Sequence, residues 1–223
     1  MTQDHRPTAV FDLDGTLLSA DSTAEWLKWL LRESLLKGLA GLAVLPFALP
    51  LVTVAPLRRH GGSLLLWIAS HGFDEGRLKA SMDAFVRRFE AGEASFRWYA
   101  EGIATLDQHL AAGHRVVVVT AAPQWLAERL LAPWLERLTV IGSSLRRVGR
   151  GWVVDQHVRG ALKAQRLAEE GFGKRWSWAY SDSDDDAPML APAEQAFLVN
   201  AGAGKHRRTA ARGCGHAVGL RWR

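Results

Sequence analysis

Two aspartates separated by one residue end an apolar run near the start of the chain. Residues 10–17 read VFDLDGTL, so Asp12 and Asp14 follow a strand-like segment that stops at Gly15. Side chains alternate along an extended strand, so both carboxylates project from the same side. Carboxylates held this close repel each other unless a cation or a shared proton separates their charges. The pair therefore predicts a divalent cation site, and Mg²⁺ is the simplest occupant.

Two further polar residues follow later segments. Residues 115–120 read RVVVVT, and this β-branched run, apolar on both faces, predicts a buried parallel strand that ends in Thr120. Lys163 lies near the start of a helix expected over 160–170. A hydroxyl and an ammonium group can both stabilise phosphoryl oxygens, so these residues suit a phosphate site.

An acidic loop follows a third apolar run, 176–181. Four of the next five residues are aspartates, and Asp182 and Asp186 are the outer pair. Because ligands bind beyond the carboxyl ends of parallel strands, we expect this loop to lie beside the first aspartate pair. Asp184 and Asp185 are interpreted as solvated turn acids.

Strand-like segments alternate with helical patterns along most of the chain. This alternation predicts an α/β fold with a parallel sheet and helices on both faces. An all-helical stretch interrupts it directly after the first strand, so the predicted domains are a catalytic core of 1–19 plus 98–223 and a helical cap of 20–97. Strands are expected over 8–13, 115–120, 139–143, 176–181 and 195–199, with a hairpin over 145–154. Helices are expected over 73–92, 94–112 and 160–170, and another is expected to follow Ser22 as its N-cap.

The helical stretch contains a segment, 38–57, with twenty residues and no charge, which is the length of a membrane span. Three prolines within it argue against one straight helix. The first aspartate pair precedes the segment and every other candidate follows it, so any membrane crossings are even in number. The favoured interpretation is a hairpin that enters one leaflet and turns near 46–50, with arms 26–45 and 51–70. A soluble, Pro-broken cap that packs against the core is the alternative.

The composition of the chain limits the classes of partner and the compartment that can be expected. A net charge of +5 and a pI near 9.8 favour anionic partners such as nucleic acid, acidic lipid or phosphate esters, without choosing among them. Nucleic acid is not the expected partner, because no recognisable nucleic-acid-binding module accompanies the charge. Cys214 is the one cysteine, so no internal disulfide is expected and a reducing compartment is favoured. The polar N-terminus predicts no secretory signal. The basic tail from Gly202 is interpreted as a solvated surface that could face anionic lipid.

The motifs, in this order, resemble those of the haloacid dehalogenase-like (HAD) superfamily, in its phosphoserine-phosphatase-like branch. The resemblance rests on the DxDGT motif at 12–16, on Thr120, on Lys163 and on the acidic loop. It implies a Rossmann-like core with an all-helical C1 cap, Mg²⁺ as cofactor, Asp12 as a nucleophile that forms an aspartyl-phosphate and Asp14 as acid and base.

Site residues expected from the motifs fall into three groups. The expected metal ligands include Asp14 through its backbone carbonyl, and Asp186 is expected to bind metal waters or position Asp182. Ala121-Ala122 departs from the small polar residues that often follow this Thr in relatives. The expected residues are Asp12, Asp14, Thr120 and Lys163 for catalysis, Thr120, Ala121 and Lys163 for substrate, and Asp12, Asp14, Asp182 and Asp186 for the metal.

Within that branch the chain is most similar to the phosphatidylglycerophosphatase C family. Segments that carry this similarity are SLLLW at 63–67, PWL at 133–135, GWV at 151–153 and YSDS at 180–183. It implies hydrolysis of phosphatidylglycerophosphate to phosphatidylglycerol at the cytoplasmic face of a bacterial inner membrane. A soluble cytoplasmic phosphatase for a small metabolite such as phosphoserine is the alternative, and a non-catalytic lipid-binding protein is a remote one.

Overall fold

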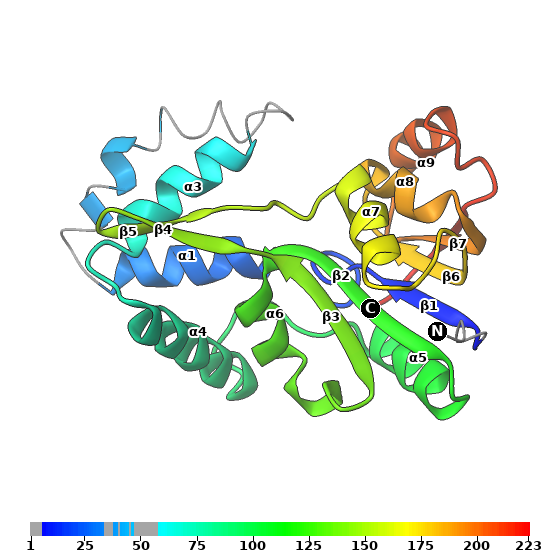
Figure 1. Ribbon diagram of the computed structural model, residues 1–223, viewed down its shortest axis with the longest axis horizontal. Coiled ribbons are helices and arrows are strands. Elements are labelled where there is room, and N and C mark those ends of the chain that lie inside the picture. The colour runs from blue at the N-terminus through cyan, green and yellow to red at the C-terminus, as the bar shows by residue number, and fades with distance from the viewer. Residues whose placement is uncertain (1–5, 34–37, 40, 45, 47–57) are drawn as a thin grey trace.

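The computed structural model describes residues 6–33, 38–39, 41–44, 46 and 58–223. A six-stranded parallel sheet runs through its centre, in the order β3-β2-β1-β6-β7-β8 (Figure 1). This arrangement confirms the predicted α/β class. The strands are β1 (Thr8–Phe11), β2 (Arg115–Pro123), β3 (Leu138–Ser143), β6 (Trp176–Ser181), β7 (Ala193–Val199) and β8 (Val218–Leu220).

The central strands form because their side chains are apolar on both faces. All four residues of β1 are buried, and so are most of those in β2. Phe11 pairs with Val118 on one side and with Tyr180 on the other. This register brings the residues that follow β1, β2 and β6 to one edge of the sheet, where the predicted motifs meet.

Helices cover both faces of the sheet. On one face Phe11 packs into a core with Leu106 of α5, and on the other Val10 packs with Leu167 of α7. Figure 1 shows α5 and α6 on one side of the strands and α7 and α8 on the other. The helices are α1 (Ser22–Arg32), α3 (Arg58–Ala69), α4 (Glu75–Glu90), α5 (Ala100–Ala111), α6 (Gln124–Leu130), α7 (Ala161–Glu169), α8 (Ala187–Leu190) and α9 (Ala203–Ala211).

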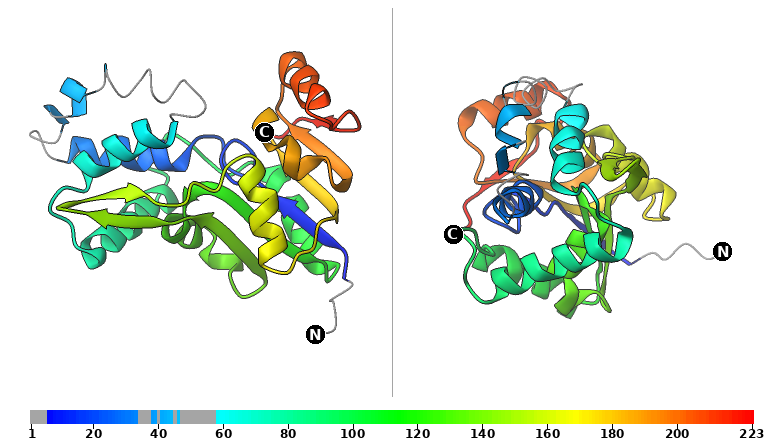
Figure 2. Two further views of the ribbon diagram at one scale, coloured as in Figure 1. Left: turned by 45° about the horizontal axis from the view of Figure 1, so that its top comes forward. Right: turned by 90° about the vertical axis from the view of Figure 1, so that its left-hand side faces the viewer.

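Helices α1, α3 and α4, here called the helical insert, lie together at one end of the molecule (Figure 1; Figure 2, left). They share that end with the predicted hairpin, which forms as β4 (Leu145–Val148) and β5 (Gly151–Val154). The Trp152 N–H donates to Ser70 Oγ at 2.9 Å, and Trp67 Nε1 donates to the Val148 carbonyl at 2.9 Å. The hairpin therefore binds the insert to the later half of the chain, a contact that the sequence analysis did not predict.

Two helix starts differ from the predictions for reasons that the structure shows. Asp21, not Ser22, caps α1, because its carboxylate accepts a hydrogen bond from the Ala24 N–H at 2.8 Å. Helix α5 begins at Ala100 and not near residue 94, because Trp98 bridges to Leu18 in extended backbone. The basic tail begins with helix α9, whose role is described below.

Only part of the predicted membrane hairpin can be compared with the structure. Its predicted first arm, 26–45, begins within α1, which ends at Arg32 and buries Trp26, Leu27 and Leu30 in the protein core. Residues 47–57, which include most of the predicted turn, lie outside the described residues. Among the described helices, none has both the length and the apolar content needed to cross a membrane.

His109 of α5 gives the fold a pH dependence. Its ring is buried, with Nδ1 2.9 Å from His114 Nδ1 and Nε2 3.0 Å from the Tyr180 hydroxyl. Burial, with a smaller effect of His114, lowers the pKa of His109 from 6.5 to about 4. The unfolded chain therefore binds a proton that the folded chain does not, and stability is lost as the pH falls below 6.5.

We expect His109 alone to lower the free energy of unfolding by about 2 kcal/mol as the pH falls from 7 to 5. The substitution His109→Gln removes the titrating ring, so the difference in stability between variant and wild type should be smaller at pH 5 than at pH 7. Urea unfolding at the two pH values measures it. An equal difference in stability between variant and wild type at pH 5 and pH 7 would show that His109 does not cause the pH dependence.

Candidate active site

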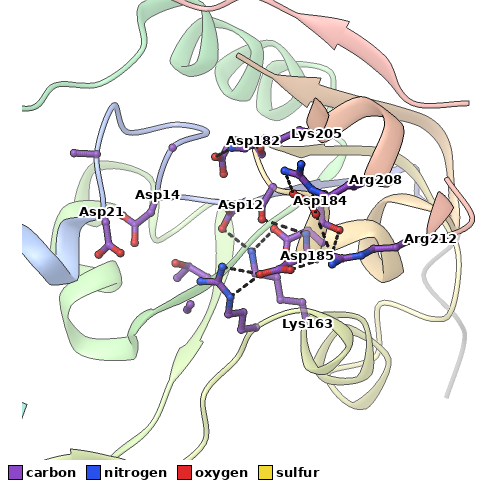
Figure 3. Close-up of a pocket in the computed structure, with 17 residues that line it drawn as sticks. Asp12, Asp14, Asp21, Lys163, Asp182, Asp184, Asp185, Lys205, Arg208 and Arg212 are labelled. Atoms are coloured by element: carbon purple, nitrogen blue, oxygen red, sulfur yellow. Dashed lines mark hydrogen bonds and ion pairs between the residues drawn. The ribbon is translucent and has the colours of Figure 1, made fainter. Parts of the chain in front are cut away.

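The predicted motif residues converge on one cavity of about 590 Å³ at the carboxyl edge of the sheet (Figure 3). The loops after β1 and β6, the last part of β2 and helix α9 supply its walls, and α7 supplies Lys163. The cavity is thus built as expected for a parallel sheet, beyond the strand ends. Its lining includes every predicted site residue: Asp12, Asp14, Thr120, Ala121, Lys163, Asp182 and Asp186.

A buried ion-pair network holds Asp12. Lys163 Nζ lies 2.6 Å from Asp12 Oδ1 and 2.8 Å from Asp186 Oδ2, and all three side chains are almost inaccessible to solvent. Asp186 also accepts a hydrogen bond from Ser181 Oγ at 2.7 Å. One oxygen of Asp186, Oδ2, is therefore engaged with both Lys163 and Ser181. In this geometry Asp186 orients the lysine.

Burial and charge act in opposite directions on this network. Burial raises the pKa of Asp12, and the neighbouring Lys163 ammonium lowers it, with a net value of about 7. The two carboxylates around Lys163 raise the pKa of its ammonium despite burial. The lysine is therefore a permanent cation, and it favours the ionised form of Asp12 that nucleophilic attack requires.

Asp14 lies on the opposite side of the cavity, near the start of α1 (Figure 3). Its Oδ1 accepts a hydrogen bond from the Ser22 N–H at 2.9 Å. Burial raises the pKa of Asp14 well above its ordinary value, and the charge of Asp21 raises it further. A carboxyl group that keeps its proton near neutral pH suits an acid that protonates a leaving group.

Thr120 ends the central stretch of β2 and is fully buried. Its hydroxyl accepts a hydrogen bond from the Ala122 N–H at 3.1 Å, which leaves the hydroxyl proton for another acceptor. Ala121 lines the same cavity. The pair stands where a phosphoryl oxygen could bind, with Lys163 as the nearby cation.

Thr16 and Gly15 fix Asp182 against the first motif. The Asp182 N–H donates to Thr16 Oγ1 at 2.9 Å. Gly15 has φ +78°, and a Cβ there would lie 2.7 Å from Asp182 Cγ. Only glycine therefore permits both this backbone conformation and the close approach of the carboxylate.

We expect Gly15→Ala to displace Asp182 and to weaken Mg²⁺ binding about tenfold or more. The added methyl group cannot occupy the space of the Asp182 carboxylate. Titration calorimetry with Mg²⁺ measures the change, and Gly149→Ala is a control for left-handed backbone strain because nothing lies within 4 Å of its Cβ position. Equal affinity in wild type and Gly15→Ala would contradict the assignment of Asp182 to the cation site.

The donor set fits a hydrated Mg²⁺ ion. Asp12 and Asp182 supply carboxylate oxygens, Asp14 can add its backbone carbonyl, and all three line one cavity. Mg²⁺ takes one or two carboxylates and keeps several waters. Within the described residues, no group of three or more acidic, histidine or cysteine side chains is close enough to form a protein-only metal cage. The fit therefore depends on two carboxylates, the carbonyl and water.

The interpretation of Asp184 and Asp185 as solvated turn acids is wrong. Asp184 is buried and lies 2.9 Å from Arg208 Nε, and Asp185 Oδ1 lies 2.9 Å from Arg212 Nη1. The basic tail is also not merely a solvated surface. Helix α9 docks on the acidic loop because its cations neutralise acids that would otherwise repel one another (Figure 3).

Lys205 is a further residue of this site that the sequence analysis missed. Its Nζ lies 2.8 Å from Asp182 Oδ2 and 2.7 Å from the Asp182 carbonyl. Arg159 was missed as well, and its Nη2 lies 2.8 Å from Asp185 Oδ2. Their positions in the sequence were a usable signal, because Arg159 lies four residues before Lys163 and α9 follows a strand of the same sheet.

A second cavity of about 320 Å³ adjoins the first. Its lining is mostly apolar and comes from the helical insert and the end of β2. Leu27, Leu31 and Leu65 contribute from α1 and α3. Four residues line both cavities: Asp14, Asp21, Ala121 and Arg159. The second cavity is thus continuous with the side of the site where a leaving group would lie.

Known proteins share the sequence pattern and the fold. A family model described as haloacid dehalogenase-like hydrolase matches residues 9–191. Protein CicA of Caulobacter vibrioides is 29% identical over 200 residues, which are 86% of this chain and 85% of that protein. A protein with unknown function from Bordetella pertussis Tohama I has a similar structure, with TM-score 0.73, 21% identity and 96% and 98% of the two chains covered. A phosphoserine phosphatase in apo form has TM-score 0.61 and 13% identity over 91% and 90% of the two chains.

Proposed function

Because this chain belongs to the haloacid dehalogenase-like hydrolase family, we propose that it hydrolyses phosphate monoesters through an aspartyl-phosphate on Asp12. The observation that carries the proposal is the placement of Asp12. Its carboxylate lies 2.6 Å from a buried ammonium group, in a cavity that also contains Thr120 and Asp14. A nucleophile, a cation and an acid thus face one space.

The proposed reaction has two steps. An oxygen of Asp12 attacks phosphorus, the ester P–O bond breaks, and Asp14 donates its proton to the departing alkoxide. A water molecule then attacks the phosphorus of the acyl phosphate, Asp14 takes a proton from that water, and the Asp12 carboxylate leaves. The products are an alcohol and inorganic phosphate, and both aspartates return to their starting protonation states.

Other residues stabilise charge during these steps. Lys163 offsets the charge of Asp12 and of the phosphoryl group, while Thr120 and Ala121 bind phosphoryl oxygens. Asp186 keeps the lysine oriented. Bound Mg²⁺, held by Asp12, Asp182 and the Asp14 carbonyl, would neutralise the charge that repels an anionic nucleophile from a phosphate dianion. The role of Mg²⁺ as the cofactor is part of the proposal.

We propose a small phosphorylated metabolite such as phosphoserine as the first substrate to consider. Several solved structures with this fold are phosphoserine phosphatases, and one carries a phospho-aspartyl intermediate analogue. Those names describe the neighbours, whose identity to this chain is 13% and 15%. They support the substrate class and the covalent intermediate by analogy of fold.

Phosphatidylglycerophosphate is the second candidate, with a location at the inner membrane. Two observations favour it: the apolar cavity beside the catalytic one, and the exposure of Leu39 and Leu42, which are 57% and 66% accessible. An apolar leaving group would fill the cavity, and exposed leucines could contact lipid. The division into a core and a cap at residues 19/20 and 97/98 belongs to the same proposal, since the insert would present the site to the substrate.

Phosphate release with and without Mg²⁺ tests the proposal. Phosphoserine and phosphatidylglycerophosphate are compared with the detergent-solubilised protein, at matched detergent concentration. We expect Mg²⁺-dependent release from at least one of them, and the ratio of the two kcat/KM values assigns the substrate class. A failure to release phosphate from either ester and from p-nitrophenyl phosphate would overturn the proposed reaction.

A further inference from the structure

Arg159 lies at the junction of the catalytic cavity and the apolar cavity, and it lines both. It lies in the segment that leads into α7, four residues before Lys163 in the chain. Its side chain is 39% accessible, so the guanidinium is neither buried in the core nor free in solvent. None of the reaction steps above uses it.

Asp185 of the acidic loop fixes the orientation of Arg159, and Arg212, directly after α9, holds Asp185 in turn. Asp185 Oδ2 accepts hydrogen bonds from Arg159 Nε at 3.2 Å and from Nη2 at 2.8 Å. The other oxygen of Asp185 is held by Arg212 Nη1 at 2.9 Å. One edge of the planar guanidinium is therefore anchored. Among the residues that the structure describes, no partner is found for Nη1, so that edge remains able to donate.

Arg159 belongs to a charge cluster in which arginines outnumber carboxylates by one. Three arginines share two carboxylates in this cluster, which consists of Arg159, Arg208, Arg212, Asp184 and Asp185. Burial lowers the pKa of Arg159, but the hydrogen bond and charge of Asp185, with smaller effects of Asp186 and Asp12, raise it above its usual value. Arg159 and the nucleophile Asp12 line the same cavity. A fixed cation near the phosphoryl site, with donors to spare, suits an anionic ligand group.

We propose that Arg159 binds a second anionic group, carried by the leaving group of the phosphate ester, and so selects esters with such a group. This inference rests on the proposed function, because it assigns the leaving-group side of the same site. The anion has two chemical sources: the carboxylate of a phosphorylated amino acid or the phosphodiester of a lipid phosphate. In both, the group lies a few bonds from the ester oxygen, beside the cavity that Arg159 lines.

Matched substrates and variants test the inference by kinetics. Phosphoserine is compared with phosphoethanolamine, which lacks the carboxylate, and p-nitrophenyl phosphate reports the chemistry alone. Arg159→Gln should raise KM for phosphoserine roughly tenfold or more, with kcat nearly unchanged, because an ion-paired hydrogen bond to substrate is lost. It should lower kcat/KM for p-nitrophenyl phosphate several-fold less than kcat/KM for phosphoserine, because p-nitrophenol carries no second anion. Arg159→Lys should restore part of the loss, since the charge is kept without the planar fork.

A second set of substrates tests whether the second anion is the phosphodiester of a lipid phosphate. Short-chain phosphatidylglycerophosphate is compared with octyl phosphate, which has an apolar chain but no phosphodiester. If the lipid is the source, Arg159→Gln raises KM for the first ester only. The matched control is Arg166→Gln on α7, since Arg166 pairs with Glu169 and Glu170 of its own helix terminus and lines neither cavity.

A binding measurement separates failure of this inference from failure of the proposed function. Phosphonates are not hydrolysed, so calorimetry with 2-amino-4-phosphonobutanoate and with 3-aminopropylphosphonate compares ligands with and without a carboxylate, whether or not the protein is a phosphatase. Wild type should bind the ligand with the carboxylate more tightly than the ligand without it. If the lipid is the source of the second anion, the preferred ligand is a phosphonate that carries a phosphodiester. In either comparison, Arg159→Gln should lose the preference. Equal losses for ligands with and without the second anion, or no loss for either, would overturn the inference.

Discussion

Asp12→Asn should abolish phosphate release, with a fall in kcat of about 10⁴-fold or more. An amide has nearly the same shape as the carboxylate but cannot attack phosphorus to form an acyl phosphate. The fold should survive, since Lys163 keeps its 2.8 Å ion pair with Asp186. Continuous phosphate release with Mg²⁺ measures the activity, and thermal unfolding verifies the fold.

Asp155→Asn is the matched control for this substitution. Asp155 pairs with Arg146 at the exposed hairpin, 3.2 Å away, and it does not line the catalytic cavity. Its kcat should stay within about twofold of wild type. Substantial turnover by Asp12→Asn, with a native unfolding transition, would show that another group attacks the substrate.

Lys163→Met should damage both activity and stability. The methionine fills much of the same volume but leaves two buried carboxylates, Asp12 and Asp186, without their ammonium partner. Removing one member of a buried ion pair costs about 3–5 kcal/mol, and losing the cation beside the phosphoryl group costs about 10³-fold in kcat/KM. Lys174→Met, at an exposed position, is the matched control, and it should change neither the free energy of unfolding nor kcat/KM by much.

The destabilisation by Lys163→Met should depend on pH in a definite direction. Burial raises the pKa of Asp12, and the substitution removes the Lys163 ammonium group that opposes this rise. Folded Asp12 then binds a proton that the unfolded chain releases, so the variant is most stable at low pH and loses stability as the pH rises. Urea unfolding in EDTA at pH 5 and pH 8 measures this, and a defect that is larger at pH 5 would contradict the assignment of Lys163 as the partner of Asp12.

The central fold could be predicted because its signals are local. A β-branched run such as 115–120 specifies a buried parallel strand, and the turn at Gly15 marks where β1 stops. Parallel pairing then brings strand ends together, which is why Asp12, Thr120 and Asp182 could be expected at one edge without coordinates. Helix boundaries were less accurate where tertiary contacts decide them, as at Trp98.

The missed parts of the site depend on contacts between distant segments. The acids at 184 and 185 look like solvated turn residues until α9 brings Arg208 and Arg212 beside them. The partner of Arg159 is 26 residues away, and no periodic pattern relates the two positions. Charge pairing of this kind has no sequence spacing of its own, so only the folded chain reveals it.

The most direct test of the proposed chemistry is to trap the covalent intermediate. The protein is mixed with substrate and Mg²⁺, quenched in acid and treated with borohydride, which reduces an acyl phosphate of aspartate to homoserine. Peptide mass spectrometry then locates the product. We expect homoserine at position 12 in wild type and none in Asp12→Asn. Homoserine at another aspartate, or none at all while phosphate is being released, would contradict Asp12 as the nucleophile.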